Sequence, residues 1–280
     1  MQFLSRWESQ RLSTTTRGIP LVDGVATEDI GGQRWSPSRG DLALPALTLD
    51  EAAFAANRDL FLTWCASAGV SVAPHAKTPM SPELARSLRA AGAWGTTVAN
   101  VQQAAVLLAS GERRLLLANE IGGLAAGRRL GALLGAYPDV EFHAFADSPA
   151  AVAALAEAAR IAERRELSVL VELGAGRAGA RDRAAIEATI AAVLAADRLV
   201  LGGVATYEGA AATPDADETM RAIAALMERT IETFALVRAA APQRPLIMSA
   251  GGSAYFDIVA RALAPSAQAD GNASAILRSG

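Results

Sequence analysis

The amino-acid sequence predicts an α/β protein built as a (β/α)8 barrel of the TIM type. From Asp41 onward, apolar runs of strand length alternate with stretches rich in alanine and leucine, which is the pattern of repeated βα units. Eight units over roughly 200 residues suit a closed barrel. A doubly wound open sheet is the alternative, but the count of eight and the uniform composition favour the barrel. The eight predicted strands are 46–49, 70–73, 95–98, 114–118, 140–145, 167–173, 199–206 and 245–249.

Residues typical of helix ends stand between these runs. Asp50 can cap the first helix and Gly69 can end it. Pro82 and Pro149 each follow a serine, and proline is common at the first helical position. These signals support the alternation of strands and helices.

The chain is expected to have three regions. Residues 1–40 show no clear period and are rich in Gly, Pro, Ser and Thr, so we expect an N-terminal wrap of irregular structure with a short helix. The barrel is expected over 41–265. Residues 266–280 are expected to form a short stub after it.

The composition excludes several classes of protein. The net charge is −3 and the arginines are scattered along the sequence. The chain therefore lacks the basic stripe that is typical of nucleic-acid-binding proteins. No apolar run has the length of a signal core or a membrane span. Cys65 is the only cysteine, and His75 and His143 lack metal-ligand spacing, which argues against disulfides and a metal site. We therefore expect a soluble cytoplasmic chain with no metal and no membrane partner.

Lys77 is the only lysine among 26 basic residues. Because the chain uses arginine at every other basic position, position 77 is expected to need a property that arginine lacks. A desolvated lysine can lose its proton and act as a nucleophilic amine, whereas arginine stays protonated. The best-known use of such an amine is a Schiff base, including one with pyridoxal phosphate (PLP). A surface lysine retained by chance is the alternative, and the apolar strand before Lys77 argues against it.

Polar residues and glycines gather at the predicted strand ends, where barrels carry their chemistry. A glycine pair after the last predicted strand can bring backbone N–H groups close to a phosphate. One lysine and one phosphate-binding turn at the same rim suit PLP. The strand-end residues are His75, Lys77, Asn100, Asn119, Glu120, Asp147, Arg177, Tyr207, Glu208, Gly251, Gly252 and Ser253.

Several of these residues have simpler explanations. Asp147 can cap a helix, and Asn100 and Asn119 can satisfy turn backbone. Tyr207 can be a core aromatic residue and Arg177 can pair with a surface carboxylate. Gly251 and Gly252 can form an ordinary tight turn.

The run Gly174-Ala-Gly-Arg-Ala-Gly179 matches the G-x-G-x-x-G fingerprint of dinucleotide-binding folds. That fold also needs an acidic residue at the end of the next strand. Asp197 precedes the next strand and Glu208 lies about ten residues too late. The arginine inside the loop would also crowd the pyrophosphate. The motif alone is weak, so the barrel remains the preferred fold.

The ordered motifs of the chain resemble those of one enzyme group. They are Pro74-His-Ala-Lys-Thr-Pro-Met-Ser-Pro82, Gly92-Ala-Trp-Gly-Thr-Thr-Val-Ala-Asn100, Leu117-Ala-Asn-Glu120, Gly176-Arg-Ala-Gly179, Tyr207-Glu-Gly209 and Ser249-Ala-Gly-Gly-Ser-Ala-Tyr-Phe-Asp257. From about Leu12 to the last residue, the chain is similar to the amino acid deaminase, D-serine dehydratase and D-threonine aldolase relatives of alanine racemase. This resemblance implies an N-terminal PLP barrel and a C-terminal β domain.

The resemblance also implies roles for individual residues. Lys77 matches the lysine that forms the internal aldimine, and is therefore the expected catalytic residue. Arg177 matches an arginine near the phenolic oxygen of the cofactor, whereas the histidine before the lysine could be structural. The implied cofactor-binding residues are Lys77, His75, Arg177, Tyr207, Gly251, Gly252 and Ser253.

Two departures from the family pattern stand out. Pro79 occupies a position that is usually histidine in the dehydratases and aldolases, which shifts the likeness toward the deaminases, although these typically have glycine where this chain has Ala76. The sequence ends at Gly280, where relatives enter the β domain that carries their metal ligands. We expect this chain to be the cofactor-bearing part of a longer enzyme that forms a homodimer, with any divalent metal held by the missing domain.

Three functions follow from these observations. The first is a PLP-dependent lyase or deaminase acting on a D- or hydroxy-amino acid such as serine or threonine. The second is a racemase on the same scaffold, which needs another base on the opposite face of the cofactor. The third is a stand-alone PLP-binding protein with a homeostatic role and no strong catalysis.

Overall fold

The computed structural model describes residues 11–13, 15–20, 24–164 and 166–279, and the chain divides into two compact units, Met1–Asn57 and Arg58–Gly280. Part of the predicted wrap over 1–40 therefore lies outside the described residues. The rest of the first unit contains short helical segments, Thr27–Asp29 (η1), Ile30–Gln33 (α2) and Pro37–Arg39 (η2), and the start of helix α3, Glu51–Ser67. Asp50 caps α3 as predicted, because its carboxylate accepts the N–H of Ala53 at 2.9 Å.

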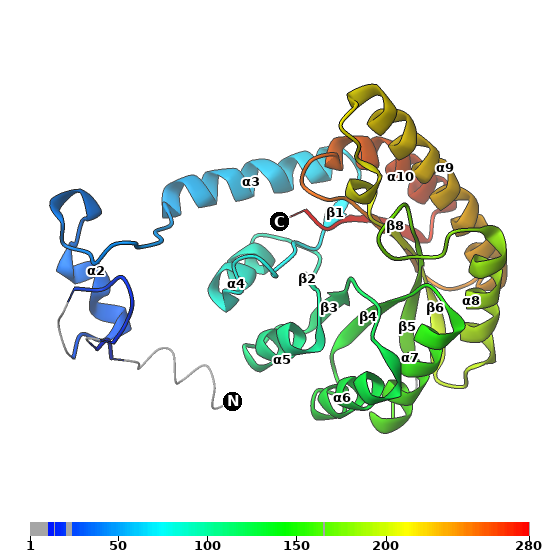
Figure 1. The fold of residues 1–280 in the computed structure, drawn as a ribbon, viewed down its shortest axis with the longest axis horizontal. Helices are drawn as coiled ribbons and strands as arrows, with labels where there is room; N and C mark the ends of the chain where they lie inside the picture. The colour runs from blue at the N-terminus through cyan, green and yellow to red at the C-terminus, as the bar shows by residue number, and fades with distance from the viewer. Residues whose placement is uncertain (1–10, 14, 21–23, 165, 280) are drawn as a thin grey trace. The chain divides into compact units, whose positions relative to one another are not determined.

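The second unit is a ring of eight parallel strands, which confirms the predicted barrel. In space the order is β1-β8-β7-β6-β5-β4-β3-β2. Figure 1 shows the helices outside this ring of strands. The strands are Ser71–Val72 (β1), Thr96–Val98 (β2), Arg114–Leu117 (β3), Glu141–Ala146 (β4), Leu167–Leu173 (β5), Leu199–Thr206 (β6), Leu246–Ala250 (β7) and Ala273–Leu277 (β8).

Two of the sequence expectations about strands are wrong. The run 46–49 forms no strand, and Leu47 is fully exposed. The eighth strand is instead β8, inside the region expected to be a stub, and the expected boundary at 265 falls within helix α10, Phe256–Asp270. A strand needs backbone partners, and β8 finds them on both sides: it pairs with β7 and with β1.

The barrel closes between β1 and β2 through the residues that follow β1. The N–H of Trp94 donates to the carbonyl of Val72 at 2.8 Å, and the N–H of Thr97 donates to the carbonyl of Pro74 at 2.9 Å. The N–H of Ala76 in turn donates to the carbonyl of Thr97 at 2.9 Å. This pairing holds the chain extended beyond Val72 and carries the next residues to the rim of the barrel.

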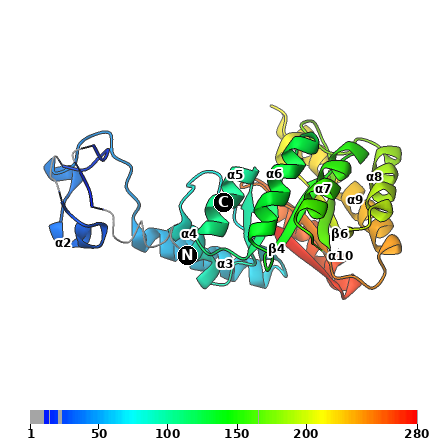
Figure 2. The same ribbon diagram turned by 90° about the horizontal axis from the view of Figure 1, so that it is seen from below.

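Helices connect successive strands and follow one another around the outside of the barrel (Figure 2). The predicted starts at Pro82 and Pro149 are confirmed, with Ser81 and Ser148 accepting N–H groups of the first turns. The remaining helices are Pro82–Ala90 (α4), Val101–Ala109 (α5), Gly123–Ala136 (α6), Pro149–Ile161 (α7), Arg183–Ala195 (α8) and Ala216–Ala240 (α9), with a short helical turn at Glu208–Ala211 (η3). No helix in the described part of the chain is long and apolar enough to cross a membrane.

Two apolar layers hold the barrel together. A large cluster fills the space between strands and helices, and a smaller one fills the barrel itself. The inner ring consists of Ala73, Leu116, Phe145, Leu170, Ala205, Ile247 and Ile276, all buried. Side chains two residues apart on a strand face the same side. Residues two positions beyond this ring therefore face the interior at the carboxyl end of the barrel.

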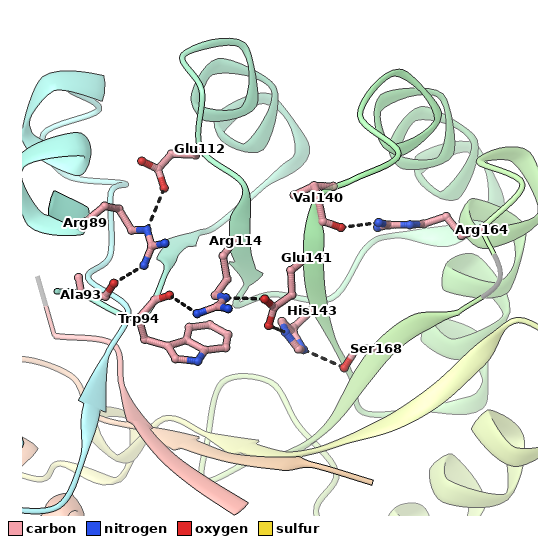
Figure 3. A network of polar contacts seen from close by, with 10 residues as sticks. All are labelled: Arg89, Ala93, Trp94, Glu112, Arg114, Val140, Glu141, His143, Arg164 and Ser168. Atoms are coloured by element: carbon pink, nitrogen blue, oxygen red, sulfur yellow. Dashed lines mark hydrogen bonds and ion pairs between the residues drawn. The ribbon is translucent and has the colours of Figure 1, made fainter.

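The amino end of the barrel is sealed by a polar network (Figure 3). Arg114 Nε donates to Glu141 Oε2 at 2.5 Å, Glu141 Oε1 lies 3.1 Å from His143 Nε2, and His143 Nδ1 lies 2.8 Å from Ser168 Oγ. The guanidinium of Arg114 also lies 5.0 Å from the ring centroid of Trp94. The hydrogen bond from His143 and the neighbouring Arg114 hold the pKa of Glu141 below its usual range. In barrels this end supplies stability.

Replacing Ser168 by alanine should destabilise the barrel. The substitution leaves a partly buried ring nitrogen of His143 without its partner, so we expect a loss of about 1–2 kcal/mol in the free energy of unfolding, measured by denaturant titration. Ser67→Ala at the exposed end of α3 is the matched control and should change the value by less than about 0.5 kcal/mol. Equal effects of the two substitutions would contradict a sealing role for the network.

Candidate functional site

A cavity of about 150 Å³ opens at the carboxyl ends of the strands. All seven residues that the sequence singled out for the cofactor line it: His75, Lys77, Arg177, Tyr207, Gly251, Gly252 and Ser253. They come from the ends of β1, β5, β6 and β7, which are far apart in sequence but adjacent at one rim. The lining also includes Asn119, Phe145, Glu172 and Arg278.

Lys77 lies just beyond the extended segment after β1, and its side chain is exposed. The sequence argument expected a desolvated amine, and this part of it is wrong for the ligand-free chain. The Nζ atom makes no hydrogen bond or ion pair with any described residue, while the backbone N–H of Lys77 donates to His75 Nδ1 at 3.4 Å. The amine is therefore free to react with a bound molecule.

Three cationic side chains face the cavity. Lys77 and Arg177 are exposed, and neither charged group pairs with a described residue. Arg278 is buried, with Nη1 donating to Ser249 Oγ at 2.8 Å and Nη2 donating to the carbonyl of Thr206 at 2.6 Å. Its guanidinium stacks over Phe145 at 5.2 Å from the ring centroid. Burial lowers the pKa of Arg278, yet an arginine stays protonated in proteins.

His75 is neutral in this setting. Burial lowers its pKa to about 4, and the nearby charges of Lys77, Arg278 and Arg177 act in the same direction. With His75 uncharged, the positive charge of the cavity resides on one lysine and two arginines. Such a cavity suits an anionic ligand.

The glycine turn after β7 is anchored by Glu208, which is fully buried. Its Oε2 accepts the N–H of Gly251 at 2.9 Å, and its Oε1 accepts the N–H of Gly252 at 2.5 Å. Gly251 has a φ of +101°, and a Cβ on it would lie 3.0 Å from Leu277 Cδ2, so a side chain would be strained there. The two N–H groups that the sequence assigned to a phosphate thus already hold a carboxylate.

Two further carboxyl groups, Glu120 and Glu172, are neighbours, and Glu172 lines the cavity. Glu172 lies on β5 and is 8% exposed. Burial raises its pKa to about 9, and the adjacent carboxyl of Glu120 acts in the same direction. Neither Oε2 of Glu172 nor Oε1 of Glu120 has a hydrogen-bond partner among the described residues.

The other strand-end residues divide between structure and site. Asn100 caps α5 by accepting the N–H of Gln103 at 2.9 Å. Ser148, and not Asp147, caps α7, while Asp147 Oδ2 accepts the N–H of Gly179 at 3.1 Å. Asn119 lines the cavity and donates to the carbonyl of Ala99 at 3.2 Å.

The glycine-rich loop 174–179 does not form a dinucleotide-binding turn. The N–H of Gly174 donates to the carbonyl of Ala180 at 3.1 Å, and the N–H of Ala180 donates to the carbonyl of Glu172 at 2.8 Å, so the loop folds back on β5. Helix α8 begins only at Arg183, with Asp182 as its cap. The loop serves instead to place Arg177 at the cavity.

Sequence reasoning missed two site residues. Arg278 fell in the expected stub, and Glu172 lies one residue before the end of its strand. Glu208 was among the predicted strand-end residues, but its contact with the glycine turn was not predicted. The two-residue spacing from the inner ring identifies Glu172 after Leu170 and Arg278 after Ile276. No cluster of three or more histidine, cysteine, aspartate or glutamate side chains in the described part of the chain could hold a metal.

The stability of the ligand-free protein should depend on His75 between pH 6.5 and 4. The folded-state pKa is below that of the unfolded chain, so the unfolded chain binds more protons in this window. The stability due to neutral His75 is present above pH 6.5 and is lost as the pH falls, by at most about 3 kcal/mol. The free energy of unfolding of wild type should therefore fall relative to that of His75→Asn as the pH drops from 6.5 to 4, whereas a constant difference would contradict the assignment.

Glu208→Gln should destabilise the protein strongly. The amide nitrogen of glutamine cannot accept a hydrogen bond, so one of the two N–H groups of the glycine turn loses its partner, at a cost of about 2–4 kcal/mol. Glu187→Gln, which alters an exposed ion pair on α8, is the matched control and should have little effect. Thermal and denaturant unfolding measure the stability of the two variants. Similar small losses in both would show that the hydrogen bonds from Gly251 and Gly252 to Glu208 contribute little.

Residues 49–262 match the family described as "Alanine racemase, N-terminal domain". A D-threonine aldolase of an Arthrobacter species is 29% identical over 167 residues, which are 59% of this chain and 43% of the aldolase. The crystal structure of D-threonine aldolase from Filomicrobium marinum is similar with a TM-score of 0.72 at 25% identity, over 96% of this chain and 64% of that one. D-threo-3-hydroxyaspartate dehydratase from Delftia sp. HT23 is similar with a TM-score of 0.64 at 25% identity, over 85% of this chain and 60% of that one.

This chain thus spans less than two thirds of the length of each of these relatives. The family match covers most of the chain and spans strands β1 to β7 of the parallel barrel, including Lys77 at its rim. The chain belongs to the alanine racemase N-terminal domain family of fold-type III PLP enzymes.

Proposed function

We propose that this chain binds PLP at the barrel rim and serves as a lyase or deaminase for a D- or hydroxy-amino acid of the serine or threonine kind. One observation carries the proposal. The free amine of Lys77 and the unpaired guanidinium of Arg177 converge with buried Arg278 on one cavity. A reactive amine surrounded by cationic groups suits a ligand that combines an aldehyde with a phosphate.

The residues of the cavity fit PLP. In this proposal Lys77 holds the cofactor and afterwards moves protons, Arg177 faces its phenolic side, and Tyr207 forms part of the wall. Bound PLP supplies an electron sink for the bond that breaks next to the amino-acid nitrogen. Neutral His75 accepts the backbone N–H of Lys77 through Nδ1 and so helps to position this residue.

The glycine turn is the proposed phosphate side of the site. Gly251, Gly252 and Ser253 line the cavity. Because Glu208 already accepts the first two N–H groups, a phosphate that reaches them has to replace a carboxylate oxygen. The proposed role of Glu208 in the ligand-free chain is to keep the turn in shape.

The relatives support the substrate class. D-threonine aldolase and D-threo-3-hydroxyaspartate dehydratase are named for D-amino acids that carry a hydroxyl group. A racemase would need a second base across the cofactor from Lys77, and a PLP carrier would need no turnover at all. Assays on D-serine, D-threonine and alanine separate these alternatives from the proposal.

Borohydride reduction of the PLP-loaded protein, followed by peptide mapping, should place the label on Lys77. The chain has a single lysine, so the N-terminal amine is the only other primary amine that can react. Lys77→Arg keeps the charge but is not a nucleophile, and it should lose the label while keeping the unfolding midpoint of the ligand-free protein. A label at the N-terminus, or none on wild type with PLP present, would refute the proposal.

A further inference from the structure

The carboxyl pair formed by Glu120 and Glu172 has no part in the function proposed so far. Glu172 follows Leu170 of the inner ring by two residues, so its side chain faces the barrel interior at the rim, where it lines the cavity. Glu120 approaches from the loop after β3. The side chain of Glu172 is more than nine-tenths buried, and its Oε2 lacks a partner among the described residues.

The neighbouring charged groups do not neutralise this pair. Asp147 is itself negative, and its oxygens already accept the N–H of Gly179 and the hydroxyl of Ser148. Arg278 is close enough to stabilise negative charge on Glu172, but its hydrogen bonds go to Ser249 and Thr206. The other titratable groups around the cavity are His75, Lys77, Arg177, Tyr207 and Glu208.

Ionising both carboxyl groups is unfavourable here, because Glu172 is buried and Glu120 is its neighbour. When two carboxyl groups share a buried site, one of them keeps its proton, because charge repulsion and desolvation both oppose the second ionisation. Glu120 is near enough to raise the pKa of Glu172, and a hydrogen bond between two carboxyl groups requires a proton.

We propose that Glu120 and Glu172 share one proton at neutral pH and that neutral Glu172 donates a hydrogen bond to an anionic oxygen of the ligand in the cavity. The protonated form would add a donor to the cationic groups Lys77 and Arg177, whereas an ionised Glu172 would repel the same ligand. The proton stays on the pair, so no bond is made or broken. The inference rests on the proposed function only for the identity of the ligand, which we take as PLP.

The shared proton can be tested without any ligand. Infrared difference spectroscopy of wild type against Glu172→Gln should show the carbonyl stretch of a protonated carboxylic acid at neutral pH, and this band should disappear near pH 9. Absence of the band at neutral pH would overturn the inference, whether or not PLP binds. A wild-type protein that shows the band but does not bind PLP would overturn the proposed function alone.

The donor role is tested by the affinity for PLP at neutral pH, followed by fluorescence. Glu172→Gln keeps a neutral donor at the cavity and should bind within about threefold of wild type. Glu172→Leu has no donor and should weaken binding by about tenfold, whereas Glu120→Gln leaves Glu172 buried and should bind within about threefold of wild type. The double variant should bind like Glu172→Gln, because no carboxyl group remains to ionise.

The remote substitution Glu187→Gln is the control and should leave the affinity unchanged. Circular dichroism checks that each variant is folded. If a variant does not fold, the infrared titration of the wild-type protein still tests whether the carboxyl pair holds a proton. Wild-type affinity in Glu172→Leu, or tenfold weaker binding in Glu172→Gln and in the double variant alike, would overturn the donor role.

Discussion

The site depends on the closure of the barrel by its last strand. Leu277 of β8 pairs in register with Val72 of β1 on one side and with Ala250 of β7 on the other. This row of three residues brings the carboxyl ends of β1, β7 and β8 together, so the segments after them place Lys77, Gly251 and Arg278 at the same rim. Without β8, the segments that supply Lys77 and the glycine turn would have no common neighbour, because they are about 170 residues apart in sequence.

The cavity keeps its positive charge because each buried carboxyl group has its own means of compensation. Glu208 is held by two backbone N–H groups and Asp147 by one N–H and one hydroxyl. Burial raises the pKa of Glu172 to about 9, which disfavours its charged form. None of the three draws the charged groups of Lys77 or Arg177 into an ion pair, so these cations remain available to a ligand. Pairing either cation with a carboxylate would weaken that attraction.

The two ends of the barrel use similar residue types for different purposes. At the amino end, Arg114, Glu141, His143 and Ser168 satisfy one another in a continuous chain of hydrogen bonds (Figure 3). At the carboxyl end, the charged groups of Lys77 and Arg177 and Oε2 of Glu172 have no partner among the described residues and surround a cavity. A network that is complete supports stability, whereas one that is incomplete is open to a ligand. The chain belongs to a family of PLP enzymes.

The sequence by itself determined the barrel and the position of its single lysine at the rim. Alternating apolar runs are a local property, so they revealed β1 to β7, and strand ends identified Lys77, Arg177, Tyr207 and the glycine turn. Only the tertiary structure decided that 273–277 closes the ring while 46–49 does not, because backbone partners and not apolarity make a strand. It also decided that Lys77 is exposed, that Glu208 holds Gly251, and that Glu172 meets Glu120. These contacts join residues more than 40 positions apart, and no local pattern records which of them become neighbours.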